Sequence, residues 1–305
     1  MLKEELAKRY KSIFKKEFYG FLESVKKPFL NSIRVNTLKI SVEELKERRK
    51  SKGWKIKQFD WYEHGFFVFK PESKLGATLE FSLGYYYVQE AASMVPPLIL
   101  DPKPGEVILD VCAAPGSKTT QMAQLMKNRG IIVANDVKLD RLVALGANLQ
   151  RCGVANTIVT QMDGIKFAKL KQKFDKVLVD APCSGTGTLR SNPVVINEVS
   201  IGGIKRLSKL QKRLVLAGLN SLKEDGVLVY STCSLEPEEN EEVIDFLLKK
   251  EDAEIEKIRL KKFKFRKGLK SWEEKEFDGR VKKCVRIYPQ DNFTDGFFIA
   301  KVRKV

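Results

Sequence analysis

Two cysteines each follow an apolar run of strand length, where a parallel sheet would place their thiols at its edge. Cys183 follows an apolar run that ends in Asp180, within the sequence Asp-Ala-Pro-Cys-Ser-Gly, and Cys233 follows a second apolar run, within Ser-Thr-Cys-Ser. A buried free cysteine is usually a small hydrophobic residue. A cysteine that follows a strand, beside an acid, a proline and a glycine turn, is better placed for nucleophilic attack than for packing. These residues predict an enzyme that attacks its substrate through sulfur.

A second group of residues predicts a nucleoside pocket. The strand expected over 107–112 runs into Cys-Ala-Ala-Pro-Gly-Ser-Lys-Thr, residues 112–119, a turn of small residues that opens a helix. Open α/β sheets bind their ligands at this edge. The turn has one glycine and lacks the Gly-x-x-x-x-Gly-Lys spacing, which argues against NAD and ATP and favours a nucleoside without phosphate. S-adenosylmethionine is such a ligand.

Two aspartates at later strand ends suit the same ligand. Asp136 could accept hydrogen bonds from ribose hydroxyls, and Asp163 could accept one from an exocyclic amine. The alternative interpretation is that each is only a helix cap or a turn residue. The recurrence of aspartates at strand ends favours a binding site.

The elements that position these residues are predicted by an alternation of strands and helices after Pro96-Pro97. The expected strands cover 107–112, 131–135, 157–161, 177–180, 227–231 and 296–302, and the expected helices end at 126 and 152 and cover 204–222 and 238–250. This alternation predicts a Rossmann-like α/β fold, a parallel sheet covered by helices on both faces. If the fourth and fifth strands are neighbours, Cys183 and Cys233 face one pocket with Asp180 and with Lys118 from a helix start.

The first 93 residues follow a different pattern. Apolar residues recur at helical spacing from 2 to 25, and a second helix is expected from Ser41, with Glu44 completing a capping box, to Gly53. Short strands are expected over 32–36, 54–59 and 65–69. We therefore expect a small α+β domain over 1–93 and a catalytic domain over 94–305. The small domain is either a plain accessory domain or one that positions RNA, and its charge favours the second.

Composition limits the partners and the compartment. Lysine and arginine number 56 against 39 acids, so the net charge of +17 favours a polyanion, with nucleic acid ahead of a membrane surface. Five cysteines without close spacing and one histidine argue against a metal site and a disulfide framework. The sequence shows neither a signal peptide nor a membrane span. These features predict a soluble cytoplasmic protein, and they identify no protein partner.

A basic segment near the C-terminus is a candidate RNA contact. Residues 257–270 hold eight basic residues and no acid, interleaved with Phe263 and Phe265. This pattern suits phosphate contact, with the aromatic side chains turned inward or toward bases. It equally suits a solvated strand face.

Four motifs together resemble one family. The segment 112–119, Asp-Ala-Pro-Cys-Ser-Gly-Thr-Gly at 180–187, Ser-Thr-Cys-Ser-Leu-Glu-Pro-Glu-Glu-Asn-Glu at 231–241 and Thr-Asp-Gly-Phe-Phe-Ile-Ala at 294–300 resemble the RNA cytosine-5 methyltransferases of the Nol1/Nop2/Sun family, most of all the archaeal tRNA type. The resemblance runs from Ser32-Ile33-Arg34-Val35-Asn36-Thr37 to Phe298. It implies the S-adenosylmethionine-dependent methyltransferase fold with an RRM-like N-terminal domain.

The resemblance also assigns roles that the residues alone leave open, since either thiol could attack. It implies that Cys233 is the nucleophile and that Cys183 assists breakdown of the covalent adduct. The chemistry of the residues themselves adds Asp180, a candidate proton donor to ring nitrogen 3, and Lys118, whose charge could lower the pKa of a nearby thiol. The cofactor contacts that the resemblance implies are Cys112, Ala113, Ala114, Pro115, Gly116, Ser117, Lys118, Asp136, Arg141, Asp163 and Asp180. One departure is Gln290, which stands where the family often has histidine.

Three hypotheses follow. The first is S-adenosylmethionine-dependent methylation of carbon 5 of cytosine in RNA, with tRNA ahead of rRNA as substrate. It needs an unstacked target base, because sulfur must reach carbon 6 of the ring. The second is an inactive RNA-binding protein on the same fold, which the presence of both thiols, Asp180 and Lys118 disfavours. The third is a DNA cytosine methyltransferase, in which the Pro-Cys thiol would attack.

Overall fold

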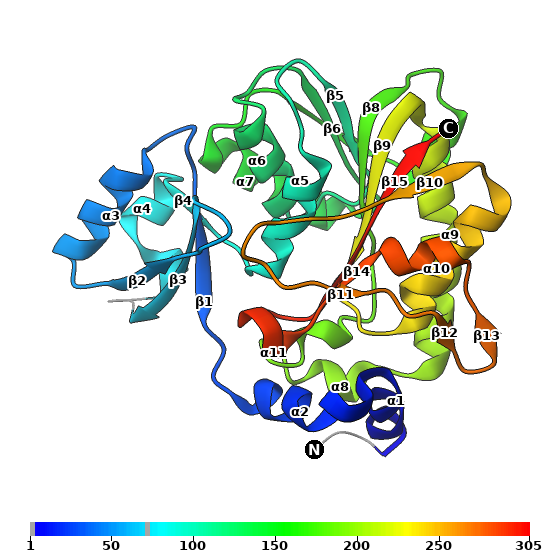
Figure 1. The fold of residues 1–305 in the computed structure, drawn as a ribbon. Coiled ribbons are helices and arrows are strands. Elements are labelled where there is room, and N and C mark those ends of the chain that lie inside the picture. The colour runs from blue at the N-terminus through cyan, green and yellow to red at the C-terminus, as the bar shows by residue number, and fades with distance from the viewer. Residues whose placement is uncertain (1–3, 71–73) are drawn as a thin grey trace.

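The computed structural model describes residues 4–70 and 74–305, and within them the strands form a four-stranded sheet, a nine-stranded sheet and a two-stranded hairpin. The first two are called the small sheet and the large sheet. Figure 1 shows the small sheet beside the large one, with helices on both faces of the large sheet. The described residues contain no helix long and apolar enough to cross a membrane.

The small sheet is antiparallel, in the order β2-β3-β1-β4. Its elements are β1 (Asn31–Val35), α3 (Val42–Ser51), β2 (Lys55–Gln58), β3 (Gly65–Lys70), α4 (Leu79–Ser82) and β4 (Tyr86–Val88). The predicted capping box of α3 is confirmed: the Ser41 hydroxyl accepts from the Glu44 amide at 3.2 Å, and the Glu44 carboxylate accepts from the Ser41 amide at 3.0 Å. Ile33, Val35 and Leu45 fill the core between this helix and the strands.

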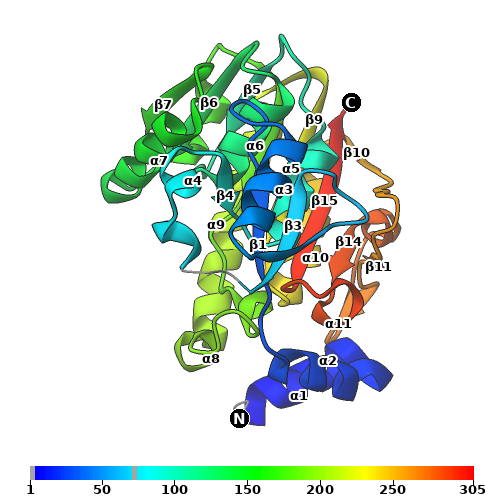
Figure 2. The same ribbon diagram turned by 90° about the vertical axis from the view of Figure 1, so that its left-hand side faces the viewer.

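The first two helices do not join the small sheet. The apolar sides of α1 (Glu4–Phe14) and α2 (Phe18–Lys26) pack into the core of the large sheet through Tyr10, Phe14 and Phe21. The guanidinium of Arg9 pairs with Glu236 at 2.8 Å and Glu238 at 2.7 Å. Figure 2 shows both helices at the lower end of the molecule, away from α3. The division of the chain at residue 93 stays a prediction.

The large sheet has the order β11-β14-β15-β9-β8-β5-β6-β7, with β10 beside β15. Its strands are β5 (Val107–Asp110), β6 (Ile131–Asp136), β7 (Thr157–Gln161), β8 (Phe174–Asp180), β9 (Leu222–Thr232), β10 (Ala253–Glu256), β11 (Arg266–Lys267), β14 (Val285–Ile287) and β15 (Phe297–Lys304). The strands β5 to β9 are parallel, and β15 runs antiparallel to β9. The predicted pairing of the fourth and fifth strands, β8 and β9, is confirmed.

Helices cover both faces of the large sheet, as the alternation predicts. One face packs against α5 (Val95–Leu100) and α6 (Ser117–Leu125), with α7 (Leu139–Cys152) beside them. The other face packs against α9 (Ile201–Asn220) and α10 (Glu241–Lys250). The helix α9 begins three residues before its predicted start, because the Ser200 side chain caps it by accepting from the Gly203 amide. The remaining elements are α8 (Val195–Glu198), α11 (Pro289–Asn292) and the hairpin strands β12 (Ser271–Trp272) and β13 (Lys275–Glu276).

A buried arginine joins the small sheet to the large one. Arg34 on β1 is 1% exposed. Its guanidinium donates to the side chains of Gln89 at 2.9 Å and Thr120 at 2.8 Å, and also to Gln124. Since Thr120 and Gln124 lie on α6, the small sheet is held against the helix that begins at the 112–118 loop.

Candidate active site

The two predicted thiols lie side by side at the carboxyl edge of the large sheet. Cys183 follows β8 and Cys233 follows β9, and their sulfur atoms are 3.3 Å apart. The Gly187 amide donates to the carbonyl of Cys233 at 2.8 Å and thereby ties the two segments together. A Cβ atom at Gly187 would lie 2.2 Å from the carbonyl oxygen of Gly296, so only glycine permits this close approach.

Behind the thiols, a buried carboxylate holds both of their loops. Glu239 is fully buried in the 3-10 turn Pro237–Glu239. It accepts hydrogen bonds from the backbone amide of Ser184 at 3.0 Å and from the hydroxyls of Ser184 and Ser234. Gln211 on α9 donates to the same carboxylate at 3.1 Å. Since Ser184 and Ser234 each follow one of the thiols, Glu239 fixes their relative position. Sequence reasoning missed this residue, although it lies within the quoted 231–241 motif.

The two thiols are not equivalent. The hydrogen bond with Cys233, together with burial, raises the pKa of Cys183 well above its ordinary value. The negative charge of Glu239 raises it further. Cys183 therefore keeps its proton and can donate a hydrogen bond to the sulfur of Cys233.

An ion pair stands beside the thiols at the end of β8. The ammonium of Lys118 donates to one carboxylate oxygen of Asp180 at 2.7 Å and to the hydroxyl of Ser93 at 3.1 Å. The other oxygen of Asp180 accepts from the Ser231 hydroxyl at 2.8 Å. Lys118 is buried, whereas Asp180 is partly exposed. Asp180 precedes Cys183 by three residues and its partner Ser231 precedes Cys233 by two, so the ion pair lies at the same edge of the sheet as the thiols.

The predicted nucleoside loop lines a polar pocket of about 190 Å³. Its lining residues are Asp110, Cys112, Ala113, Ala114, Pro115, Ser117, Lys118, Arg141 and Asp180. Gly116, at φ +104°, turns the chain into α6, and a Cβ there would lie 2.8 Å from the Leu145 side chain. The loop and the two residues of the ion pair thus share one cavity.

Asp136 and Asp163 lie at strand ends, outside the residues that line this pocket. Asp136 is buried and pairs with Arg141 at 3.0 Å, while its other oxygen accepts from the Lys138 amide. Asp163 caps a short 3-10 helix by accepting from the Ile165 amide at 3.1 Å. Arg141 also donates to the carbonyl of Ala114 and so connects Asp136 to the pocket wall. The cofactor roles of both aspartates stay predictions.

Asp110 is a pocket residue that sequence reasoning missed. One of its oxygens accepts from the Thr119 hydroxyl at 2.7 Å. The other is buried without a hydrogen-bond partner in the described part of the chain. Burial raises the pKa of Asp110 to about 7. Asp110 ends β5, so the strand-end argument that selected Asp136 also applies to it.

Gln290, the departure from the family pattern, lies in α11. Its amide nitrogen and oxygen are buried, and among residues 4–70 and 74–305 neither has a hydrogen-bond partner. It therefore donates no hydrogen bond to the thiols or to the Lys118–Asp180 pair. The same residues hold no cluster of three or more histidine, cysteine, aspartate or glutamate side chains arranged to bind a metal ion.

Known proteins match the chain along its whole length. A tRNA (cytosine(49)-C(5))-methyltransferase of Pyrococcus abyssi is 48% identical over 99% of this chain and 96% of its own. The ribosomal RNA small subunit methyltransferase F of Vibrio atlanticus is 41% identical over 94% of this chain, which spans 60% of that protein. The crystal structure of NSun6 from Pyrococcus horikoshii with SFG is 29% identical, with a TM-score of 0.86 over 99% of this chain and 98% of that one.

Two family models match separate parts of the chain. Residues 2–91 match the N-terminal domain of 16S rRNA methyltransferase RsmF, and residues 97–303 match 16S rRNA methyltransferase RsmB/F. The motifs that predicted the family all lie within these two stretches. The chain therefore belongs to the RsmB/F methyltransferase family, the Nol1/Nop2/Sun group.

Proposed function

We propose that this protein methylates carbon 5 of cytosine in RNA, with tRNA as the first substrate to test and rRNA as the second. The observation that carries the proposal is the pair of sulfur atoms 3.3 Å apart beside the Lys118–Asp180 ion pair. The relative from Pyrococcus abyssi, named for tRNA, supports the order of substrates, because this chain spans 96% of it and only 60% of the rRNA relative from Vibrio atlanticus.

The pocket beside the ion pair suits S-adenosylmethionine. Asp110 lines this cavity with a buried oxygen that has no partner among the described residues, so the site offers a hydrogen-bond acceptor that becomes negatively charged above its pKa of about 7. The loop 112–118, Asp110 and Arg141 would hold the cofactor, with Asp136 and Asp163 as further candidates. When bound, S-adenosylmethionine supplies an electrophilic methyl group on sulfur. The solved NSun6 relative with SFG supports a ligand site in this fold.

The side chains of the site account for the activation of the base. Carbon 5 of cytosine is a poor nucleophile until the Cys233 thiolate adds to carbon 6 and makes the ring an enamine. The Lys118–Asp180 pair balances the negative charge that develops at ring nitrogen 3 by donating a proton there. After methyl transfer, the proton at ring nitrogen 3 returns to the Lys118–Asp180 pair, and solvent water accepts the proton at carbon 5. The electrons of that C–H bond re-form the 5,6 double bond, and the carbon 6–sulfur bond breaks to release the Cys233 sulfur as a thiolate. The protonated Cys183, 3.3 Å from that sulfur, stabilises it as it leaves.

Methylation of defined RNAs tests the proposal. The purified protein is incubated with radiolabelled S-adenosylmethionine and with tRNA, small-subunit rRNA or a DNA strand of matched sequence, and bisulfite sequencing locates the product. We expect 5-methylcytosine in tRNA. Label in rRNA alone would reverse the order of substrates. RNA binding without label would favour the inactive RNA-binding protein, and label in DNA alone would contradict an RNA enzyme.

The hydrogen bonds between Glu239 and both thiol loops lead to a prediction for Glu239→Gln. The variant loses one of the acceptors that serve the hydroxyls of Ser184 and Ser234, so the two sulfurs lose their fixed spacing. We expect kcat for methylation to fall on the order of 100-fold, while the affinity for S-adenosylmethionine is retained. Glu242→Gln is the matched control, since Glu242 pairs with Lys212 and Lys275 away from the thiols. Equal rates for the two variants would remove Glu239 from the positioning of the thiols.

The raised pKa of Asp110 predicts a pH-dependent cofactor affinity. Burial, and to a smaller extent the charges of Asp180 and Asp136, keep Asp110 protonated below its pKa of about 7. Above that pH the carboxylate attracts the sulfonium, so affinity should rise several-fold between about pH 6 and pH 8. Calorimetric titration of wild type and Asp110→Asn over this range measures the difference. An identical pH dependence in both proteins would contradict the assignment.

A further inference from the structure

The predicted basic segment does not present all of its charge to solvent. The carboxylate of Asp291 pairs with Lys264 and with Arg266, both at 2.7 Å, and Arg266 also pairs with Glu17 at 2.8 Å. Phe263 is buried and stacks edge to face on Trp61, with ring centroids 4.9 Å apart. Lys264 and Arg266 are therefore structural, and the cations available to a partner are other residues of this region.

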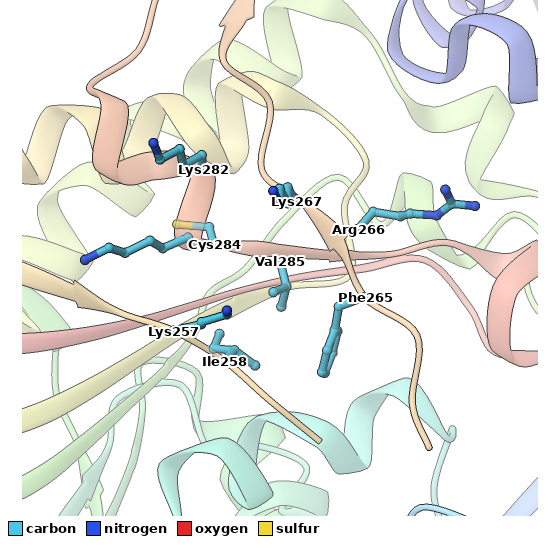
Figure 3. Close-up of a pocket in the computed structure, with 9 residues that line it drawn as sticks. Lys257, Ile258, Phe265, Arg266, Lys267, Lys282, Cys284 and Val285 are labelled. Atoms are coloured by element: carbon cyan, nitrogen blue, oxygen red, sulfur yellow. The ribbon is translucent and has the colours of Figure 1, made fainter. Parts of the chain in front are cut away.

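The available cations surround a pocket of about 360 Å³ that we call the lysine pocket. Three separate stretches of the chain form its wall: residues 257–258 after β10, residues 265–267 at β11, and residues 282–285, which run from the end of the 3-10 turn Gly279–Lys283 into β14. Figure 3 shows Lys257, Lys267 and Lys282 around the apolar side chains of Ile258, Phe265 and Val285. Its volume falls within the range of pockets that bind small ligands.

Among the described residues, four lysines of this pocket have no acidic partner. Lys257, Lys267, Lys282 and Lys283 are exposed, and no described side chain forms an ion pair or a hydrogen bond with any of them. Four positive charges around one cavity repel one another unless an anion lies between them. The floor is apolar, since Ile258, Cys284 and Val285 are buried there, and the Phe265 ring is partly exposed. The pocket therefore suits an anion attached to an apolar or aromatic group.

The lysine pocket lies on the face of the large sheet that carries the nucleophile. Val285 on β14, Ile299 on β15 and Ser231 on β9 are in register across three neighbouring strands. Two strand spacings, roughly 10 Å, thus separate Val285 from Ser231. Cys233 comes directly after β9, one residue beyond Thr232. It packs against the apolar cluster that contains Val285 and Ile258. An RNA strand whose target base lies at Cys233 can therefore reach the pocket with a nucleotide only a few positions away.

We propose that the lysine pocket binds a phosphate and its attached nucleotide from a single-stranded stretch of RNA next to the target cytosine. The inference rests on the proposed function, because it assumes that the target cytosine is bound at Cys233. The four ammonium groups neutralise the phosphate, and the Phe265 ring offers a surface on which a base can stack. The unstacked target that the reaction requires leaves its neighbouring nucleotides free to enter such a pocket. The site would favour targets in loops and at helix ends.

The test replaces two lysines of the pocket with acids. For Lys267→Glu/Lys282→Glu, we expect the affinity for substrate RNA to fall roughly 10- to 30-fold at about 0.1 M salt. The slope of log affinity against log salt should decrease by about 0.7 for each lysine removed. The matched control is Lys169→Glu/Lys171→Glu, which changes two exposed lysines in the segment between β7 and β8, outside the residues that line the lysine pocket. Its affinity should stay close to that of wild type.

A footprint on the unmodified protein avoids any effect of substitution on folding. Bound RNA should protect Lys267 and Lys282 from acylation by an N-hydroxysuccinimide ester, while Lys169 stays reactive, as mass spectrometry of the peptides reports. Equal RNA affinity of the two double variants, or unprotected pocket lysines, would overturn the proposal. So would a loss of binding to phosphatidylserine vesicles with RNA affinity unchanged, which would assign the pocket to a membrane. RNA binding is measured apart from methyl transfer, so failure of the pocket and failure of the proposed function are distinguishable.

Discussion

Cys183→Ala protein mixed with S-adenosylmethionine and substrate RNA should accumulate a covalent protein–RNA complex that survives a denaturing gel. The Cys183 thiol lies 3.3 Å from Cys233 and retains its proton, because hydrogen bonding and burial raise its pKa. Without it, the sulfur of Cys233 must leave carbon 6 unaided, so the methylated adduct persists. Cys233→Ala should form no complex and should lose methyl transfer by on the order of 10³-fold or more, since it removes the nucleophile.

The double variant Cys183→Ala/Cys233→Ala identifies the bonded sulfur. It should form no complex, which shows that the trapped species depends on Cys233. Unchanged affinity for S-adenosylmethionine in all three variants serves as the control for folding, because the cofactor pocket contains neither Cys183 nor Cys233. A complex formed by Cys233→Ala and absent from Cys183→Ala would reverse the two roles and match the order expected of the DNA enzymes.

The architecture around the thiols follows from patterns that sequence displays directly. Apolar runs of strand length alternate with helical periodicity after Pro96-Pro97, and this alternation allows few topologies other than a parallel sheet. The pairing of β8 with β9 then brings Cys183 and Cys233 to one edge, as predicted. The capping box of α3 was predictable for a similar reason, since its two hydrogen bonds join residues three apart.

Features that depend on distant residues were not predictable in this way. The sequence shows that α1 and α2 each have an apolar side. It does not show which core these sides pack into, and in the structure they pack against the large sheet. Lys264 and Arg266 read as free charge in the basic segment, yet Asp291, more than twenty residues away, neutralises both. Glu239 is one of several buried acids in its motif, and only its hydrogen bonds to the two thiol loops show what it holds.

Asp180→Asn should slow methyl transfer by roughly 10²- to 10⁴-fold, the range in which a positioned proton donor contributes. The asparagine can still accept from the Ser231 hydroxyl, so the local backbone should be retained. It leaves the buried ammonium of Lys118 without its carboxylate, however, and the pair can no longer shuttle a proton to ring nitrogen 3. Ser231→Ala is the matched control: it removes one hydrogen bond to Asp180 and keeps the ion pair, and should cost no more than about 10-fold.

The double variant Asp180→Asn/Lys118→Met distinguishes a role that Asp180 and Lys118 share from two separate roles. If Lys118 and Asp180 act as a unit, the first substitution already removes the proton transfer, and the double variant should be no slower than the slower single variant. The measurement is single-turnover methylation at saturating RNA and cofactor, which separates chemistry from binding. Losses that simply multiply would mean that Lys118 and Asp180 contribute independently. Because their side chains are 2.7 Å apart and both line the cofactor pocket, the structure favours the shared role.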